Sequence, residues 1–186
     1  RAGRQLDRTT TDRPATLLSM SVFFEFDDVA AFTVGTVGRP GERTFLLQAR
    51  ADDQRVTVKC EKQQTAAIVQ YLRKVLADLP PPEDRPMPGA LELRDPLDPA
   101  FVLGPIGLGY DRSNDRVLIQ LEEIGEVDDE GEPLDEDRGH VRLYLSRGQA
   151  TAFCDHADSV VEAGRPPCQW CSFPMDPDGH ACPRMN

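Results

Sequence analysis

The spacing of apolar residues changes twice along the chain from a period of two to a helical period, and this change most constrains the fold. β-formers alternate or cluster over residues 22–26, 32–37, 44–49 and 55–60, which we predict to be strands. Apolar residues between Ala67 and Leu79 then recur three and four apart, as on one face of a helix. The first half of the chain therefore predicts strands followed by one helix.

Proline ends this helix, because Pro80 and its two successors lack the amide donor and clash with the preceding turn. Residues 80–100 contain seven prolines, and we expect them to form an irregular crossing segment. Three more strands are predicted at residues 101–110, 116–122 and 140–145. A second helix is predicted at residues 149–163, beginning near Ser146, whose hydroxyl can cap the exposed amides.

The two strand-to-helix junctions match at an offset of 85 residues. The residues Val56, Val58, Cys60, Lys62, Gln64, Ala67 and Val75 fall on Val141, Leu143, Leu145, Arg147, Gln149, Ala152 and Val160. We therefore predict an α+β fold: a mainly antiparallel sheet of about seven strands, two helices on one face and a pseudo-twofold internal repeat. Coincidence stays open, because any such junction repeats apolar positions. Gln64 and Gln149 are either solvated or paired polar groups beside a cleft.

Three parts of the chain are expected. Residues 1–19 show little apolar periodicity and are predicted to be a disordered or loosely held tail. Residues 20–165 form the α+β domain, with halves at about 20–80 and 100–165, and residues 166–186 form a zinc-binding knuckle.

The formal charge of −11 is concentrated in one segment, residues 122–138, which has ten acidic residues and one basic residue. Glycines and a proline interrupt it, so we predict a solvated acidic loop. A calcium loop would need acidic ligands at fixed offsets and a specific glycine, and the segment lacks both. A partner-facing acidic surface is the functional alternative.

The last segment contains the clearest chemical pattern, Cys168 and Cys171 two residues apart, followed by His180 and Cys182. A Cys-x-x-Cys turn brings two sulfurs close enough to share a tetrahedral metal, and two further N or S ligands complete the shell. We predict a structural Zn²⁺ ion on these four residues. The one-residue gap of the second pair is less common, and Asp176, Asp178 or His156 are the nearest replacements.

Other roles for this tail fit less well. A redox Cys-x-x-Cys begins a helix, whereas this one follows a helix end. A catalytic zinc keeps one position open for water, but three cysteines and a histidine fill all four. Iron is less typical of a single quartet that includes a histidine. About twenty residues bury too little apolar area to fold alone, so metal is expected to fix the knuckle, with Trp170, Phe173 and Pro174 packed against it or the main domain. The aromatic residues are also candidates for an interaction surface.

The rest of the sequence shows no catalytic motif for nucleotide binding, serine hydrolysis or metalloproteolysis. Cys60 and Cys154 occupy positions typical of buried packing. Five cysteines are an odd count for a disulfide framework, and no segment approaches the length of a membrane span. We therefore expect reduced thiols and a cytoplasmic protein.

Several motifs are similar to those of one family: Phe24-Glu25-Phe26-Asp27, Gly35-Thr36-Val37-Gly38, Gly41-Glu42-Arg43-Thr44-Phe45, Leu47-Gln48-Ala49-Arg50, Glu61-Lys62-Gln63-Gln64, Gly164-Arg165-Pro166-Pro167-Cys168 and Gly179-His180-Ala181-Cys182-Pro183-Arg184. From about Ser21 onwards the chain resembles an actinobacterial family of uncharacterised proteins classed as a domain of unknown function. It departs from that pattern at Ser172, where a glycine often follows the second cysteine. The resemblance implies a cytoplasmic actinobacterial protein with no established activity.

Three functions are compared. The leading hypothesis is a noncatalytic binding or adaptor protein that presents its sheet and knuckle to a protein partner. The second is an enzyme or small-ligand binder that uses a cleft between the repeats, near Gln64, Gln149, Arg147 and His156. Nucleic-acid binding comes third, because Trp170 and Arg184 suit RNA but no basic patch is evident.

Overall fold

The computed structural model describes residues 22–39, 41–52, 54–83, 85–125, 138–164, 167–175 and 179–185. The tail predicted at residues 1–19 and most of the predicted acidic loop lie outside this described part, although the start of that loop still belongs to the sixth strand. The elements are β1 (Phe23–Phe26), β2 (Ala31–Val37), β3 (Thr44–Arg50), β4 (Arg55–Cys60), α1 (Lys62–Ala77), η1 (Pro88–Leu91), β5 (Phe101–Asp111), β6 (Arg116–Glu123), β7 (His140–Leu145) and α2 (Arg147–Glu162).

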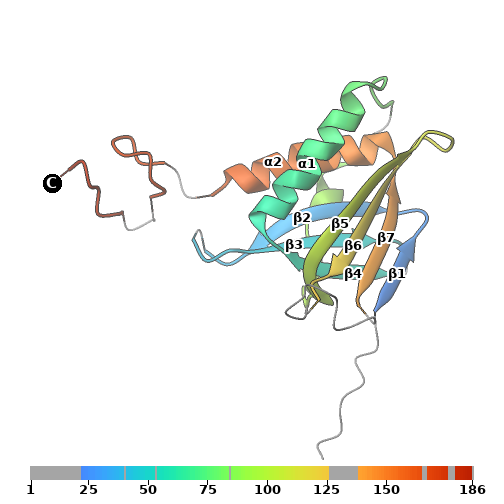
Figure 1. Cartoon of the computed structure of the whole chain (residues 1–186), viewed down its shortest axis with the longest axis horizontal. Helices are drawn as coiled ribbons and strands as arrows, with labels where there is room; N and C mark the ends of the chain where they lie inside the picture. The colour runs from blue at the N-terminus through green and yellow to red at the C-terminus, as the bar shows by residue number, and fades with distance from the viewer. Residues whose placement is uncertain are drawn as a thin grey trace, which may run out of the picture.

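The seven strands form one mixed sheet in the order β1-β7-β6-β5-β4-β3-β2. Neighbours are antiparallel except for two parallel pairs, β1 with β7 and β4 with β5. Short connections join β2 to β3 and β3 to β4, and both of these pairs are antiparallel. Both helices lie over the same side of the sheet (Figure 1). The predicted α+β class is therefore confirmed.

A short connection forces this sheet to curve. β1 and β2 are the two edge strands, yet only residues 27–30 join them. The edges of a flat seven-stranded sheet lie about 29 Å apart, because neighbouring strands are spaced by about 4.8 Å. The chain from Phe26 to Ala31 can span at most about 18 Å. The two edges must therefore approach each other, and β2, β3 and β4 run across the direction of β5, β6 and β7 (Figure 1).

The hydrophobic core fills the space between the curved sheet and the helices. The rings of Phe32 from β2 and Phe153 from α2 stack with centroids 4.7 Å apart. Alternate residues of β6 and β7 point into the same core, including the fully buried Ile119 and Leu143. This burial gives the helices their fixed positions.

Two glutamines begin the helices in the same way. Gln64 accepts a hydrogen bond from the backbone amide of Glu61, and Gln149 accepts one from the amide of Ser146. The Ser146 hydroxyl in turn accepts from the Gln149 amide, which confirms the predicted cap of α2. The same capping arrangement starts α1 at Lys62, one turn before the apolar spacing begins.

The parallel strand pairs also match at the offset of the predicted repeat. Val58 of β4 lies opposite Phe101, and Leu143 of β7 lies opposite Phe26. The parallel pairing of β1 with β7 thus corresponds to the parallel pairing of β5 with β4. The pseudo-twofold repeat itself stays a prediction.

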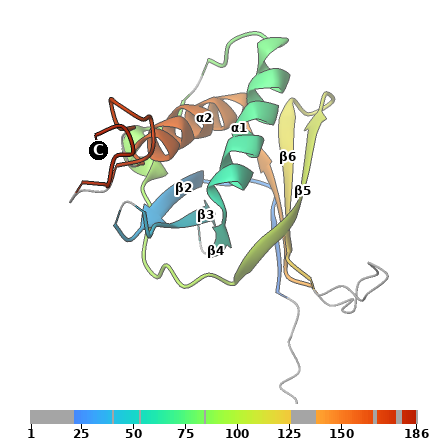
Figure 2. The same cartoon turned by 60° about the vertical axis from the view of Figure 1, so that its left-hand side comes forward.

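Residues 80–100 form a strap that covers the face of β2, β3 and β4 opposite the helices. Figure 2 shows this segment passing from the end of α1 around β2 and β3 to β5. The Thr33 hydroxyl donates to the carbonyl of Leu91 in the strap. A Cβ atom on Gly35 would come within 2.5 Å of the Leu93 side chain, so the strap lies directly on the strand.

The side chain of Gln48 connects the strap to the sheet. Its Nε2 donates to the carbonyl of Arg94 at 2.8 Å, and its Oε1 accepts from the amide of Arg94 at 3.0 Å. Nε2 also donates to the Thr57 hydroxyl on β4 at 3.0 Å. Gln48 has no exposed surface, so every polar atom of its amide must be satisfied within the protein.

Replacement of this amide tests the role of the strap. Gln48→Leu leaves the amide and carbonyl of Arg94 without their side-chain partner in a buried layer. We expect the free energy of unfolding to fall by about 2–4 kcal/mol. The measurement is urea denaturation followed by circular dichroism. Gln70→Leu, on the exposed face of α1, is the matched control and should change the stability by less than about 0.5 kcal/mol. Equal stability of the two variants would show that the strap contributes nothing through Gln48.

Candidate metal centre

The knuckle is built from two turns. In the first turn, the amide of Cys168 donates to the carbonyl of Phe173, and the amide of Ser172 donates to the carbonyl of Cys168, both at 2.8 Å. Ser172 has a φ of 63°, which places it in the left-handed region that glycine adopts most easily. Ser172, at the position where the family that the chain resembles often has a glycine, therefore keeps the turn but introduces backbone strain.

The second turn carries the other two ligands. Gly179, at a φ of 90°, immediately precedes His180. The amide of Met185 donates to the carbonyl of Cys182 at 3.1 Å, and Arg184 Nη1 donates to the carbonyl of Trp170 at 2.9 Å. The Arg184 contact ties the second turn to the first.

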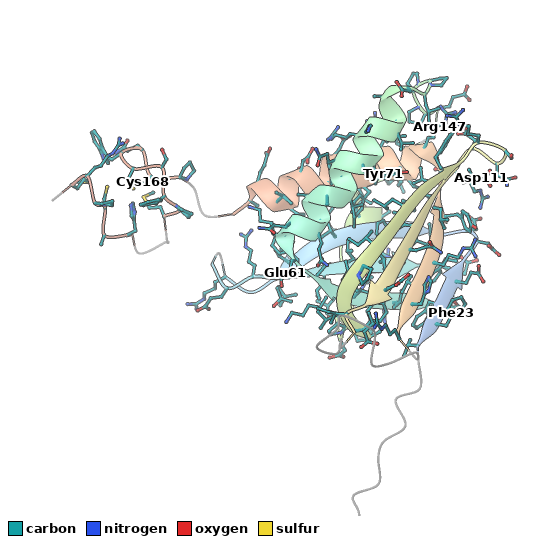
Figure 3. All side chains as sticks on the ribbon, viewed as in Figure 1. Phe23, Glu61, Tyr71, Asp111, Arg147 and Cys168 are labelled. Carbon is teal, nitrogen blue, oxygen red and sulfur yellow. The ribbon has the colours of Figure 1, made fainter. Side chains whose placement is uncertain are left out.

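These turns bring the predicted ligands together. One ligand atom from each of Cys168, Cys171, His180 and Cys182 lies within 4.8 Å of all the others. Cys171 Sγ and His180 Nε2 are 3.1 Å apart, and Cys168 Sγ and Cys182 Sγ are 3.9 Å apart. Two thiolates on one tetrahedral zinc, at Zn–S distances of about 2.3 Å, would be separated by about 3.7 Å. The set therefore has the dimensions of a metal site, and Cys168 lies within the loop of the knuckle (Figure 3).

The chemistry of the set also suits a cation. All three cysteines are free thiols. The Trp170 amide donates to Cys168 Sγ at 3.4 Å, and backbone amides lower the pKa of this thiol below its ordinary value. A lower pKa favours the thiolate of Cys168, which is the form that binds metal, whereas burial raises the pKa of Cys171. His180 Nδ1 is buried and has no hydrogen-bond partner among the described residues.

Of the three replacement ligands, His156 is the one that the structure describes, and it does not join this group. Nε2 of His156 lies 2.9 Å from the carbonyl of Val34, far along the chain from the knuckle. Asp176 and Asp178 lie outside the described residues. The uncommon spacing of His180 and Cys182 is thus compatible with a single four-ligand group.

The aromatic residues of the knuckle do not pack as expected. Trp170 is 54% exposed and Phe173 is 59% exposed, so the prediction that they pack against the metal site or the main domain is wrong. Their short turn has too little chain around it to cover two aromatic rings. Only Pro174 lines a hollow together with residues of the main domain, among them Arg43 and Lys62.

The residues named for a cleft between the repeats are used separately. The Gln64 side-chain amide donates to the carbonyls of Leu103 and Gly104, at 3.0 and 3.1 Å. Gln149 donates to the carbonyl of Val29, and Arg147 Nε donates to Asp115 Oδ2 at 2.9 Å. Both glutamines hold backbone in place, so the pattern that suggested paired site residues reflects paired helix starts.

Another group of residues was missed by the sequence analysis. Arg50, Arg55 and Arg94 line one large hollow beside the strap. Arg50 and Arg55 flank the connection between β3 and β4, but their spacing matches no motif. Only the path of the strap brings Arg94 to them.

Two cysteines outside the knuckle lie in the core. Burial raises the pKa of Cys60 to about 11 and that of Cys154 to about 12. Both thiols therefore remain protonated at neutral pH, and the prediction that they serve packing fits these surroundings.

Alkylation distinguishes the two sets of cysteines. In protein treated with a chelator, iodoacetamide at about pH 8 should label Cys168, Cys171 and Cys182, because the chelator removes any metal that these thiols hold and leaves them accessible. Cys60 and Cys154 should stay unlabelled until denaturant is added, since their raised pKa values and burial leave little reactive thiolate. Peptide mass mapping identifies which cysteines are alkylated. Rapid labelling of Cys154 in the folded protein would contradict this assignment.

No helix in the described part of the chain is long and apolar enough to cross a membrane.

Comparison with known proteins identifies a family. A family model described as "Protein of unknown function (DUF3090)" matches residues 24–182, from β1 to the last of the four ligands. No curated protein and no solved structure matches the chain. Since the family model spans most of the sequence, the chain belongs to the DUF3090 family, a family of unknown function.

Proposed function

We propose that this chain is a noncatalytic binding protein whose knuckle holds a structural Zn²⁺ ion and presents aromatic side chains to a protein partner. One observation carries the proposal: the exposed Trp170 lies between Cys168 and Cys171, two members of the four-ligand group. A metal bound there would fix the backbone on both sides of the indole ring.

The ligand set supports zinc in a structural role. Three sulfurs and one imidazole nitrogen satisfy a tetrahedral ion and leave no position for a reacting water. Thiolate and imidazole ligands suit zinc better than magnesium or calcium, which prefer oxygen. Structural zinc contributes on the order of 10–16 kcal/mol in small finger peptides, enough to order a segment without a core of its own.

The exposed surface of the knuckle supports a protein partner. Trp170, Phe173 and Met185 are all more than half exposed, and aromatic residues and methionine are enriched in protein interfaces. Arg184 already donates to the Trp170 carbonyl, and the chain has a formal charge of −11. Both features make a nucleic-acid partner a poor fit. Free thiols in such a site suit a reducing compartment, which favours the cytoplasm.

The metal content tests the first part of the proposal. Protein purified without added zinc should contain about one equivalent of zinc per chain by elemental analysis. Cys171→Ser should lose most of this zinc, because it removes one of four ligands. Cys60→Ala, in the core, is the control and should keep it. Metal-free protein with a disulfide between Cys168 and Cys171 would refute the zinc assignment.

The aromatic side chains test the second part. We expect the full chain, used as bait with chemical crosslinking, to recover one protein reproducibly. The Trp170→Ala/Phe173→Ala variant should reduce that recovery by about tenfold or more while zinc content stays unchanged. Phe23→Ala removes an aromatic ring of similar exposure from β1 and serves as the matched control. Equal recovery with all three proteins would exclude the knuckle as the binding surface.

A further inference from the structure

A hollow of about 700 Å³ opens where the strap meets the β3–β4 hairpin. Its charged lining consists of Arg50 at the end of β3, Arg55 at the start of β4 and Arg94 in the strap, together with Asp52 and Asp98. Phe24 of β1 reaches the same hollow, because the curvature of the sheet brings its two edges near each other. The hollow is therefore assembled from segments that are distant in sequence.

Arg50 is the buried member of this group, at 7% exposed. Its Nη1 donates to the carbonyl of Glu92 at 2.7 Å, and its Nη2 donates to the carbonyl of Ala90. These bonds fix the guanidinium group in one orientation and hold the strap. These two hydrogen bonds satisfy N–H donors of the Arg50 guanidinium group, but the carbonyl groups do not neutralise its positive charge.

In the described part of the chain, the three arginines form no ion pair. Arg73, Arg85, Arg142 and Arg147 form the ion pairs found among the described residues, and Arg50, Arg55 and Arg94 take part in none of them. Burial lowers the pKa of Arg50, and the charges of Arg94 and Arg55 lower it further. The guanidinium groups are thus close enough to repel one another. Three arginines that form no ion pair among the described residues thus line one polar hollow.

We propose that this hollow binds the oxyanion group, phosphate or carboxylate, of a small organic molecule. Arg55 and Arg94 are exposed at the rim and supply donors to the oxyanion, whereas Arg50 supplies fixed charge at the base. A volume of about 700 Å³ lies within the usual range for small-molecule sites.

The two carboxylates narrow the class of ligand. Asp52 and Asp98 line the hollow and are exposed. They accept hydrogen bonds from hydroxyl or amino groups on the body of a ligand, and they repel a second anionic group. The hollow therefore suits a molecule with one oxyanion and several donors, and it disfavours a polyanion such as RNA. None of its lining residues belongs to the knuckle, so this site stands independently of the zinc and the protein partner.

Titration calorimetry with the full zinc-loaded chain tests the site. Inorganic phosphate is the probe in one arm and acetate in the other, both at low ionic strength, and the stronger binder identifies the head group. Arg55→Gln/Arg94→Gln should weaken binding of the preferred anion by about tenfold or more, since two charge-assisted hydrogen bonds are lost. Arg39→Gln, an exposed arginine in the β2–β3 turn, makes the same charge change elsewhere and should leave binding unchanged.

A second variant, expected to strengthen binding instead of weakening it, keeps the test decisive if the double variant loses its fold. Asp98→Asn removes a repelling carboxylate from the hollow and should strengthen binding by about twofold to fivefold. Circular dichroism confirms the fold of each variant. Failure of both anions to bind the unmodified chain would overturn the proposal. Binding that Arg39→Gln weakens as much as the double variant does, or that Asp98→Asn leaves unchanged, would also overturn it.

Discussion

Both faces of the sheet depend on the hydrogen bonds that the side-chain amide of Gln48 makes. The strap crosses strands whose outer face carries polar side chains, and its own backbone groups would lose water there. Gln48 pairs with both backbone groups of Arg94 and with Thr57, so the strap, β3 and β4 share one hydrogen-bonded layer. This layer lets the chain leave α1, pass around β2 and enter β5 beside β4. Without it, β2, β3 and β4 would have a solvated face and no fixed route to the second half.

The molecule uses two different means of stabilisation. Between β1 and α2, buried apolar residues from the curved sheet and the helices form a continuous core. The knuckle buries few side chains beyond Cys168 and Cys182, and its aromatic residues face solvent. We therefore expect its folded form to depend on the proposed metal, because backbone hydrogen bonds in two turns offset little of the ordering entropy. The strain of the left-handed Ser172 would be compensated by the metal–ligand bonds of the proposed site.

The sequence predicted the parts whose signal is local. Alternating residues in β6 and β7 identified strands, and the spacing of Cys168 and Cys171 identified a metal ligand pair. An irregular crossing segment at residues 80–100 was predicted, but which strands it covers was not. A polar residue such as Gln48 at an alternate strand position looks the same under solvent or under a covering segment. The arginine hollow depends on that covering and was missed with it.

The exposure of Trp170 and Phe173 could not be predicted from the sequence either. Apolar character indicates that Trp170 can be buried, but it does not show whether enough chain lies nearby to cover it. The matched positions of Gln64 and Gln149 gave a correct signal that was interpreted too broadly. Each glutamine caps a helix and holds the backbone of the neighbouring strand region, so their correspondence is structural.

The parallel pairing of β1 with β7 has a consequence for synthesis on the ribosome. In the described part of the chain, β1 is the first strand in sequence, and β7, the strand that it pairs with, is the last. Until β7 emerges, β1 has no template, and the apolar side of Phe26 remains without its core. β1 can therefore take its place in the sheet only after β7 has been translated.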